Sequence, residues 1–560
     1  MARAKAFATV GIIALLAVLP IRFFPPSGVL VAVLVLILSL WLFPDLSRLP
    51  ITRTEWLQMA ALAGAVAMNY LLAMQRHRAV LTASILFLYL VVHLFVRIHL
   101  SEHQHRILLR GLALLSGGCA LWALNQKIYG IPEMLDLLGH VDLPDADLIA
   151  ARLRSGRVFG TFILPSAFGS FLILALPVTG WCLARANAWR GRIGWGAIAG
   201  LQAWALFQTQ SHGAVLSLLF SLVLVALFGA PRRWRMTILG GALLTGLILS
   251  AVVIARGGIL LDPSGPVGQR WGVWKSAWNM ILAHPWFGVG AGGFGIAFPQ
   301  YRIEGINETQ FVHNSFLQLV TEYGVWILVP LFLILAKSLP LFLNPGRGRP
   351  GMGRELFLGV GCLAYLIHNL VDFSFFLPET AVPFLVVSGV LSLAPGRPEE
   401  REVQSGRRGP AGLLLVVAAA GFWIFSGSLF LSDFFLHKGK RSFQEGDCEA
   451  AIQSLDRAIA LHPGRPGVWG VRASVAYQMA GADPDALARA LEFATRAKEL
   501  DPFTPFRHAM IGRISYSLGD DSAAYLSLRR ASRLYPLQVD YRRQLAEVEK
   551  RIGTSPEPER

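Results

Sequence analysis

Charged residues are scarce in this chain, and acidic residues are the scarcer kind. Charged side chains make up 15% of the 560 residues, with 35 aspartates and glutamates against 51 lysines and arginines, while hydrophobic residues make up 54%. A soluble domain of this size carries a much larger share of charge on its surface. The composition therefore argues against a water-soluble globular protein and predicts a chain that is buried mostly in a membrane.

Cysteine is rare as well, and no metal-binding pattern is present. Cys119, Cys182 and Cys362 lie inside apolar runs and Cys448 stands alone near the C-terminus. Four cysteines so placed do not form a disulfide framework. No group of histidines, cysteines and carboxylates has the spacing of a zinc site. We therefore expect no disulfide, no metal and no cofactor.

Long apolar runs are what the chain has in quantity. Runs of about 17 to 25 residues recur, which is the length that a helix needs to cross roughly 30 Å of hydrocarbon. They predict about thirteen spans, near residues 6–22, 26–43, 55–74, 79–97, 107–127, 163–184, 191–208, 213–229, 236–255, 315–340, 355–376, 378–394 and 411–432. We expect the first to be a retained helix rather than a signal peptide, because no small-residue cleavage site precedes Pro20 and a second span follows at once.

The net charge of +16 has a plain explanation in such a chain. In a soluble protein it would suggest nucleic acid, but here the basic residues fall in alternate loops, as the positive-inside rule requires. The loop from Gln75 to Arg78 is a small exception. A cytoplasmic N-terminus then puts residues 128–162, 256–314 and everything after 433 outside, in the periplasm of a bacterium. We expect no nucleic-acid partner.

The tail after residue 433 is more polar and repeats a degenerate pattern. Three copies of a glycine, several small residues, a leucine and a proline end at Pro463, Pro502 and Pro536, which are 39 and 34 residues apart. A glycine between two helices, small residues where they touch and a proline after the second resemble tetratricopeptide repeats. Roughly three such repeats are needed to bury a continuous core. The tail therefore predicts a small solenoid that binds protein or glycan or gives shape, without catalytic residues.

Two arginines are candidates for binding phosphate. Arg157 precedes a predicted span in Arg-Val-Phe-Gly-Thr-Phe, and Arg270 begins an amphipathic segment, 269–284, that places Trp271, Trp274 and Trp278 at helical spacing. The segment is typical of a helix lying in the membrane interface. Each arginine has the planar fork that matches phosphate oxygens. The alternative for Arg157 is a side chain that snorkels to the headgroups.

The segment from His284 to Gly324 interrupts the apolar spans with glycines and titratable residues. Its glycines, 288–295, lack the preceding strand and the lysine of a phosphate loop, so a turn that lets the backbone pack closely is the better interpretation. His313 stands with Asn314 at a helix start, and its ordinary pKa near 6.5 suits a general base. Glu322 is about half a turn out of phase with His313. We therefore expect Glu322 to bond another helix instead.

Three further polar residues are candidates for support. His368 and Asp372 are four residues apart and should share a helix face near its outer end, where a structural ion pair is the alternative. His212 marks another outer turn, where it either binds substrate or caps a helix. With Arg157, Arg270 and His313, these residues come from five separate places that the charge-based topology puts on one side. That convergence favours a functional site.

Several of these stretches resemble one known family. They are Arg157-Val-Phe-Gly-Thr-Phe, His284-Pro-Trp-Phe-Gly-Val-Gly-Ala-Gly-Gly-Phe, His313-Asn-Ser-Phe-Leu-Gln-Leu-Val-Thr-Glu-Tyr-Gly and His368-Asn-Leu-Val-Asp-Phe. They are similar to the O-antigen ligase and polymerase superfamily over roughly residues 1–394. The resemblance implies a metal-independent, inverting glycosyltransferase that uses an undecaprenyl-diphosphate-linked glycan at the periplasmic face of the inner membrane. Its functional arginines and histidine would correspond to Arg157, Arg270 and His313.

The expected architecture is all-α: a bundle of about 12 to 13 transmembrane helices followed by an α-solenoid of tetratricopeptide-like repeats. Its parts are a ligase-like membrane domain over 1–394, a cytoplasmic basic linker over 395–410, a further span over 411–432, repeats over 433–552 and a disordered tail over 553–560. The acceptor stays open between glycan, lipid A-core and a protein hydroxyl, and envelope polysaccharide-assembly proteins are possible partners of the repeats. A transporter of lipid-linked glycan and an assembly scaffold are the alternatives of another class. A transporter, however, would carry ionisable residues through the bilayer midplane.

Overall fold

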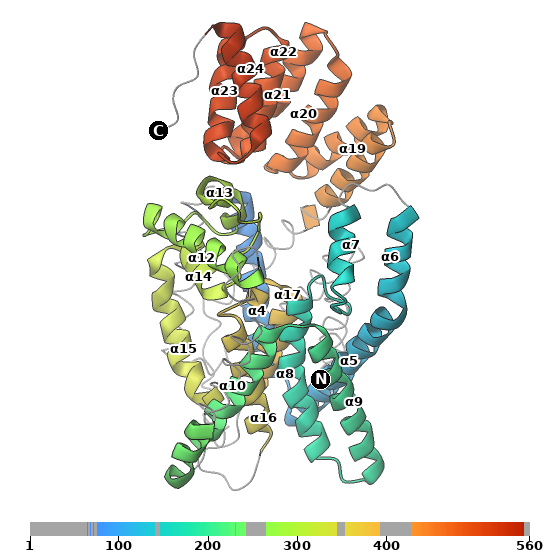
Figure 1. The fold of residues 1–560 in the computed structure, drawn as a ribbon, viewed down its shortest axis with the longest axis vertical. Coiled ribbons are helices and arrows are strands. Elements are labelled where there is room, and N and C mark those ends of the chain that lie inside the picture. The colour runs from blue at the N-terminus through green and yellow to red at the C-terminus, as the bar shows by residue number, and fades with distance from the viewer. Residues whose placement is uncertain are drawn as a thin grey trace, which may run out of the picture.

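The computed structural model describes residues 64, 68, 71, 76–140, 146–229, 231–241, 265–343, 353–392, 427–428 and 431–553. The predicted spans at 6–22, 26–43, 55–74, 236–255 and 411–432, the linker over 395–410 and the tail beyond 553 therefore lie mostly or wholly outside the described residues. Within the described part, every regular element is a helix, which confirms the all-α prediction. Figure 1 shows a helical bundle with a second group of helices at one end.

The bundle consists of long apolar helices and several shorter ones. Their bounds are α4 (Arg76–His99), α5 (Glu102–Asn125), α6 (Ile131–His140), α7 (Ala146–Arg154), α8 (Pro165–Ala184), α9 (Trp189–Gln208), α10 (His212–Gly229), α12 (Pro266–Ala283), α13 (Phe294–Tyr301), α14 (Ser315–Tyr323), α15 (Leu328–Leu343), α16 (Arg354–His368) and α17 (Pro378–Ser392). Among the described residues, four stretches are long and apolar enough to cross a membrane: 102–140, 165–184, 212–229 and 325–343. The chain is a membrane protein.

Helix α8 forms the centre of the bundle. It contacts α5, α9, α10, α16 and α17, and the side chains of Phe168, Phe171 and Leu172 are completely buried. A helix that is apolar on every side must be buried on every side. Helix α10 instead leaves Leu216, Phe220 and other large apolar side chains about half exposed, as expected of a surface covered by lipid.

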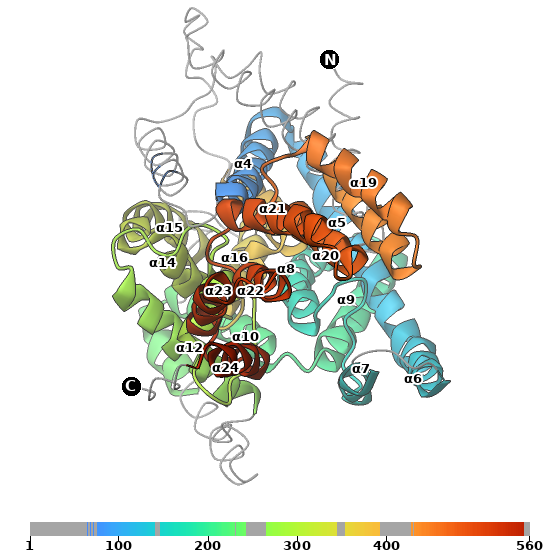
Figure 2. The ribbon, with the colours of Figure 1, turned by 90° about the horizontal axis from the view of Figure 1, so that it is seen from above.

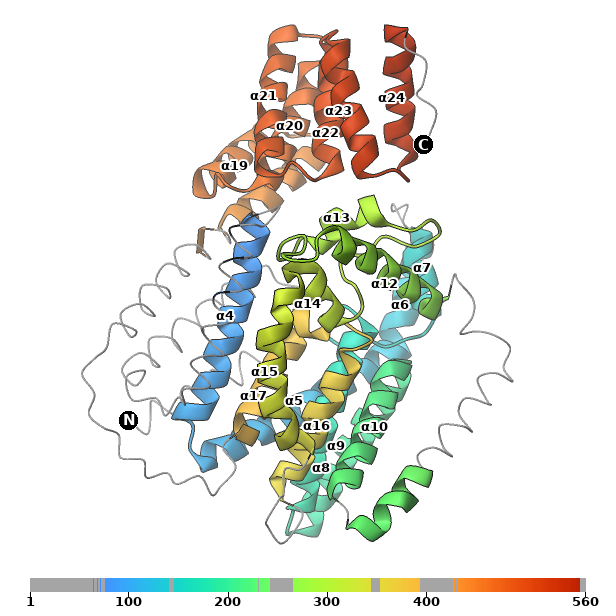
Figure 3. The same ribbon diagram turned by 90° about the vertical axis from the view of Figure 1, so that its left-hand side faces the viewer.

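Three predicted boundaries were wrong. The span predicted at 315–340 is two helices, because Gly324 has a φ of 75° and ends α14; the candidate span begins at Val325, so α14 lies outside it (Figure 3). The predicted outer loop at 128–162 begins as a helix, since a π-helical turn over Gln126–Gly130 joins α5 to α6. In the predicted span at 355–376, the helix ends at His368.

The C-terminal helical domain, residues 431–553, contains six complete helices. They are α19 (Cys448–Leu461), α20 (Pro466–Ala480), α21 (Pro484–Leu500), α22 (Pro505–Ser517), α23 (Asp521–Leu534) and α24 (Val539–Ile552), each packed on the next. An aspartate caps every second helix at 447, 483 and 520, where its side chain accepts a backbone N–H. The structure therefore contains an internal repeat of 36 or 37 residues. Its assignment to the tetratricopeptide class remains a prediction.

The C-terminal helical domain covers one end of the bundle, as the view from above makes clear (Figure 2). Helix α13 contacts α23 there, and the guanidinium of Arg302 lies over the ring of Tyr535, 5.2 Å from its centroid. A cation above an aromatic face is attracted by the ring's negative surface. The end of the bundle that carries α12, α13 and α14 therefore faces this domain.

Candidate functional site

The loop that carries Arg157 is held in place from two sides. On one side, the Gln126 side-chain oxygen accepts hydrogen bonds from the backbone N–H groups of Phe159 at 2.9 Å and Gly160 at 3.0 Å. The Lys127 ammonium donates to the carbonyl of Gly156 at 2.7 Å. Both side chains come from the π-helical turn, an irregularity that is frequent at functional sites. The turn thus serves to fix the loop.

On the other side, the loop is tied to the turn between α9 and α10. Arg157 donates its Nε–H to the carbonyl of Thr209 at 2.9 Å, and the backbone N–H of Val158 donates to Gln208 at 3.1 Å. Burial lowers the pKa of Arg157, and the positive charge of Arg270 lowers it further. Two guanidiniums are therefore held within electrostatic reach of each other. An anion between them would relieve both the repulsion and the desolvation.

His313 is held in an unusual backbone conformation beside an aromatic ring. Its φ is 58°, a value that only one other non-glycine among the described residues, Gln210, comes near with a φ of 51°. Such a backbone costs about 1–3 kcal/mol and is found mostly at functional sites. The Nδ1 atom of His313 is buried and has no hydrogen-bond partner among the described residues. The strained backbone and the unpaired nitrogen mark this position as more than a packing residue.

The electrostatic surroundings of His313 include two of the other candidate residues. Burial lowers the pKa of the His313 ring, the carboxylate of Asp372 opposes this and raises it, and the charge of Arg270 lowers it. Arg270 thus lies within electrostatic reach of both Arg157 and His313. The ring is therefore neutral at neutral pH, and a neutral ring has a nitrogen that can accept a proton.

Behind His313, a buried polar network joins α8, α14 and the turn after α16. His368 Nδ1 lies 2.6 Å from the hydroxyl of Ser170 and 3.7 Å from Asp372 Oδ2. Asp372 Oδ2 accepts from the hydroxyl of Ser374, while its Oδ1 is buried without a partner among the described residues. His368 and Asp372 were predicted to share a helix face. That was wrong, because α16 ends at His368 and Asp372 lies in the turn beyond it.

The same turn also fixes the start of α14, the helix that follows His313. Ser315 donates its backbone N–H to the carbonyls of Asn369 and Asp372, at 2.9 and 3.0 Å, and its hydroxyl to Asn369 Oδ1 at 2.6 Å. Asn314 caps the helix by accepting the N–H of Leu317 at 2.9 Å, a role that the sequence allowed. The conformation of His313 is thus determined by the residues that follow it.

The glycine-rich loop packs against the far end of α14. A side chain at Gly288 would lie 2.5 Å from the carbonyl oxygen of Thr321, and the next two backbone N–H groups donate to the carbonyls of Thr321 and Glu322 at 3.0 Å. Close packing of backbone on backbone, as predicted for these glycines, is confirmed. Glu322 is buried, and its side chain accepts from the N–H of Gly292 at 2.9 Å and from Gln318 at 3.1 Å. The backbone of Phe294, the first residue of α13, also hydrogen-bonds this carboxylate, which confirms the predicted bond to another helix.

The structure thus brings Arg157, Arg270, His313, His368 and Asp372 together at one end of the bundle. His212 begins α10 at the same end, next to Gly213, where an added side chain would lie 3.4 Å from His368, but its own side chain is exposed and makes none of the described hydrogen bonds, ion pairs or ring contacts. Helix α12, which carries Arg270, exposes Trp271 and Trp278 by 58% and 56%, in keeping with the interfacial helix predicted there.

Sequence reasoning missed the residues that position this cluster. Gln126 and Ser170 lie within or at the end of predicted spans, where a polar residue with no obvious partner was the available signal. Asn369 stands between His368 and Asp372 and was passed over. Their partners are 33 to 204 residues away along the chain, so spacing carried no information about them.

A comparison with known protein families identifies the middle of the chain. Residues 197–332 fit a family model described as O-antigen ligase, a stretch that runs from α9 into α15 and includes Arg270, the glycine-rich loop, His313 and Glu322. No curated protein matches the chain. The matched region and the helical membrane bundle support the resemblance to the O-antigen ligase superfamily seen in the sequence motifs.

Proposed function

We propose that this protein is a glycosyltransferase of the bacterial inner membrane. It transfers a glycan from an undecaprenyl-diphosphate donor to an acceptor hydroxyl at the periplasmic face, as an O-antigen ligase or polymerase does. The observation that supports this most is the meeting of Arg157, Arg270 and His313, since the first two are electrostatically coupled and Arg270 also acts on the third. A cationic pair beside a neutral imidazole suits an anionic leaving group and a hydroxyl nucleophile.

The chemistry follows from those groups. The acceptor oxygen attacks the anomeric carbon from the face opposite the diphosphate, so the configuration inverts. The bond from that carbon to the diphosphate oxygen breaks, and its electron pair stays on the diphosphate, beside Arg157 and Arg270. The hydroxyl proton passes to the ring of His313. Fixed positive charge where negative charge develops is often the largest single contribution to catalysis.

No residue in this scheme needs a metal ion, because the arginines supply the positive charge. Asp372 then acts on His313, since its carboxylate stabilises the protonated ring that forms. His368, Ser170 and Asn369 hold Asp372 and the start of α14 in position. Glu322 has a different role, because its carboxylate ties the glycine-rich loop to α14.

The activities open to this enzyme differ in the acceptor that receives the glycan. A ligase transfers to lipid A-core, a polymerase to another lipid-linked repeat unit, and an O-oligosaccharyltransferase to a serine or threonine of a protein. A transporter of lipid-linked glycan is the alternative outside enzymes. The clustering of the candidate residues at one end of the bundle favours an enzyme over a transporter, which needs polar groups along a path through the membrane.

The test is a transfer assay in proteoliposomes with undecaprenyl-diphosphate oligosaccharide and each of the three acceptors in turn. Product with one acceptor, which is lost in the His313→Ala and Arg157→Ala variants and unaffected by EDTA, is the expected result and names the activity. Full transfer by both variants at matched expression would contradict the assignment. Donor that crosses the bilayer without being consumed would identify a transporter.

A further inference from the structure

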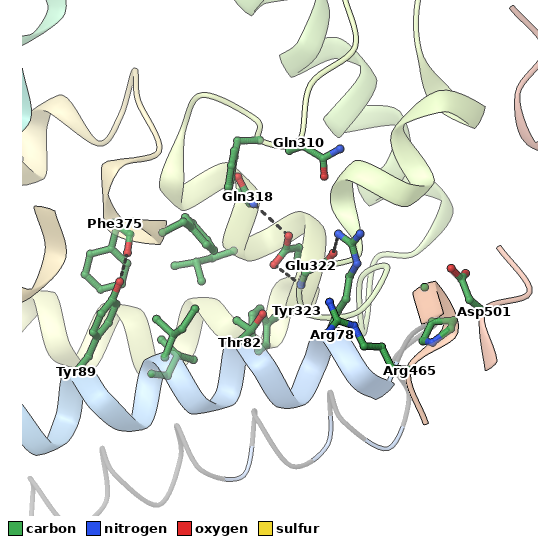
Figure 4. A pocket seen from close by; sticks show the side chains of 18 of the residues that line it. Arg78, Thr82, Tyr89, Gln310, Gln318, Glu322, Tyr323, Phe375, Arg465 and Asp501 are labelled. Carbon is green, nitrogen blue, oxygen red and sulfur yellow. Dashed lines mark hydrogen bonds between the residues drawn. The ribbon is translucent and has the colours of Figure 1, made fainter. Parts of the chain in front are cut away.

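A cavity of about 440 Å³ lies between the membrane bundle and the C-terminal helical domain. Its walls come from α4, from α14 with the loop before it, from the turn at 375–376 and from the first helices of the C-terminal domain. Figure 4 shows it as an elongated space along α4, with Tyr89 and Phe375 at one end and Arg465 and Asp501 at the other. A volume of this order is typical of small-molecule sites.

This cavity is separate from the site around His313. Arg157, Arg270 and His313 do not line it, although Phe311 does. The ring of Phe311 stacks on that of Phe373, with centroids 4.2 Å apart, and the ring of Phe373 meets that of His313 edge to face, with centroids 5.0 Å apart. A wall two aromatic rings thick therefore divides the cavity from the candidate base.

The two ends of the cavity differ in chemistry. Arg78, at the start of α4, faces one end, with Arg465 and Arg507 from the C-terminal domain. Tyr89 is eleven residues further along the same helix, or about 16 Å at 1.5 Å per residue. The residues between, with Phe375 and Phe376 opposite, make that end apolar. Charged groups thus stand where α4 begins, and the apolar wall follows the helix into the predicted span.

The carboxylates at the charged end are already engaged. The two oxygens of Asp501 accept the backbone N–H and the hydroxyl of Thr504, at 3.2 and 2.6 Å, and Glu322 accepts from Gly292 and Gln318 as described above. Their hydrogen-bonding capacity is therefore directed into the protein.

Two of the arginines, in contrast, have a donor without a partner among the described residues. Arg465 Nη1 and Arg507 Nε are buried without a hydrogen-bond partner among the described residues, although Arg507 lies 3.8 Å from Asp501 in a loose ion pair. Buried N–H groups of this kind are costly unless an acceptor meets them. Arg78 donates to the carbonyl of Gly292 at 3.5 Å, and the other terminal nitrogen of Arg465 pairs with Asp433. Two buried donors without a described partner, beside carboxylates whose oxygens already accept hydrogen bonds, favour an anionic guest.

We propose that this cavity binds a second lipid phosphate of the polyprenyl type, its phosphate at Arg78, Arg465 and Arg507 and the first part of its chain along α4. The single apolar end suits one chain, whose remainder would lie between helix and bilayer. The inference rests on the proposed function, for which it names the acceptor class: a glycan that is itself lipid-linked. Donor and acceptor lipids then stand on opposite sides of the Phe311–Phe373 wall.

The test counts bound lipid on the full-length protein in mild detergent by native mass spectrometry. Undecaprenyl phosphate, phosphatidylglycerol and inorganic phosphate are added in separate samples. We expect two undecaprenyl phosphates on the wild type, one on Arg78→Ala, one on Arg157→Ala and none on the double variant. Loss of one hydrogen-bonded cation should weaken the second site by roughly tenfold or more. Leu86→Trp fills the apolar end and should remove the same lipid while leaving every arginine in place.

Arg496→Ala is the matched control, because Arg496 is an exposed arginine of the C-terminal domain that pairs only with Glu499; it should keep two lipids. One lipid on the wild type, retained by Arg78→Ala and lost from Arg157→Ala, would overturn this inference and leave the proposed function standing. No lipid on the wild type would overturn both. Equal binding of phosphatidylglycerol at the Arg78 site would replace the acceptor lipid with a bilayer lipid and would also overturn the inference, as would an adventitious response to inorganic phosphate alone.

Discussion

The imidazole of His313 stands edge-on to the ring of Phe373, with centroids 5.0 Å apart and planes at 79°. This contact holds the ring of His313 at the end of a strained backbone turn, next to the two phenylalanine rings that lie between it and the cavity lined by Phe311. The ring is oriented by packing and not by a hydrogen bond at Nδ1, which has no partner among the described residues. Its chemistry can therefore be removed without breaking a hydrogen-bond network.

The first prediction concerns His313 itself. His313→Gly should lower kcat by about 10²–10⁴, the contribution typical of a general base, while the melting temperature stays level or rises, because glycine adopts a φ of 58° without strain. His313→Ala should lose the same activity but keep the strain. Activity in either variant, measured at matched amounts of folded protein, would show that another group takes the proton.

The second prediction concerns the pH dependence that Asp372 and Arg270 impose on His313. The carboxylate raises the pKa of the ring and the guanidinium lowers it. In Asp372→Asn the His313 pKa should therefore fall, and the acidic limb of the kcat/KM profile should move to lower pH. In Arg270→Ala the acidic limb of the activity that remains should move to higher pH. Limbs that move in the same direction in both variants would rule out His313 as the titrating group.

The third prediction concerns Gln126 as a positioning residue. Gln126→Ala leaves two backbone N–H groups of the Arg157 loop without their acceptor, which should misplace the guanidinium. We expect a loss of about tenfold or more in kcat/KM, since a displacement near 1 Å can cost 10²-fold. Gln126→Glu keeps an oxygen acceptor and should restore part of the activity. A residue that only stabilises the fold would lower the melting temperature without this rescue.

The fourth prediction concerns the pH dependence of stability. Burial raises the pKa of Glu322 from an ordinary 4.5 to about 7, and the hydrogen bonds from Gly292 and Gln318 offset only part of this. The folded protein therefore holds this proton more tightly than the unfolded chain does, so its stability should fall as pH rises from about 4.5 to 7. Glu322→Gln lacks the titrating group. Melting temperatures at pH 5 and pH 8 should differ less in this variant than in the wild type, and an equal difference would contradict the assignment.

The fifth prediction compares two glycines with the same backbone requirement. Gly288 and Gly305 have φ values of 66° and 78°, but only at Gly288 would a side chain strike backbone atoms, at 2.5 Å. Gly305→Ala should cost about 1–2 kcal/mol for the left-handed conformation alone. Gly288→Ala must also separate the glycine-rich loop from α14, and should lower the yield of folded protein sharply. Similar melting temperatures for the two variants would show that the glycine-rich loop can move away from α14 at little cost in stability.

The sequence was sufficient for the parts of the molecule that local chemistry determines. Apolar runs of membrane length predicted α5, α8, α10 and α15, and the glycine-rich segment predicted close backbone packing. The sequence was not sufficient where a contact with a residue distant along the chain determines the local structure. The break at Gly324 exists because the glycine-rich loop packs there: a side chain at Gly324 would meet the carbonyl of Trp286 at 2.1 Å. Ser170 and Gln126 gained their roles from partners that no periodicity connects to them.

Helix α14 begins beside the His313 site and ends beside the cavity lined by Glu322. It spans nine residues, or about 13 Å, with Asn314 next to the proposed base at its first turn and Glu322 beside the charged end of the cavity at its last. Its backbone hydrogen bonds make it nearly rigid, and its two ends are hydrogen-bonded to the turn after α16 and to the glycine-rich loop. A ligand that tilts this helix at one end moves the other. Because linkage is reciprocal, if one lipid changes the affinity of the protein for the other, the second changes the affinity for the first by the same factor. Binding at the two sites would then be cooperative, with α14 as the element that couples them.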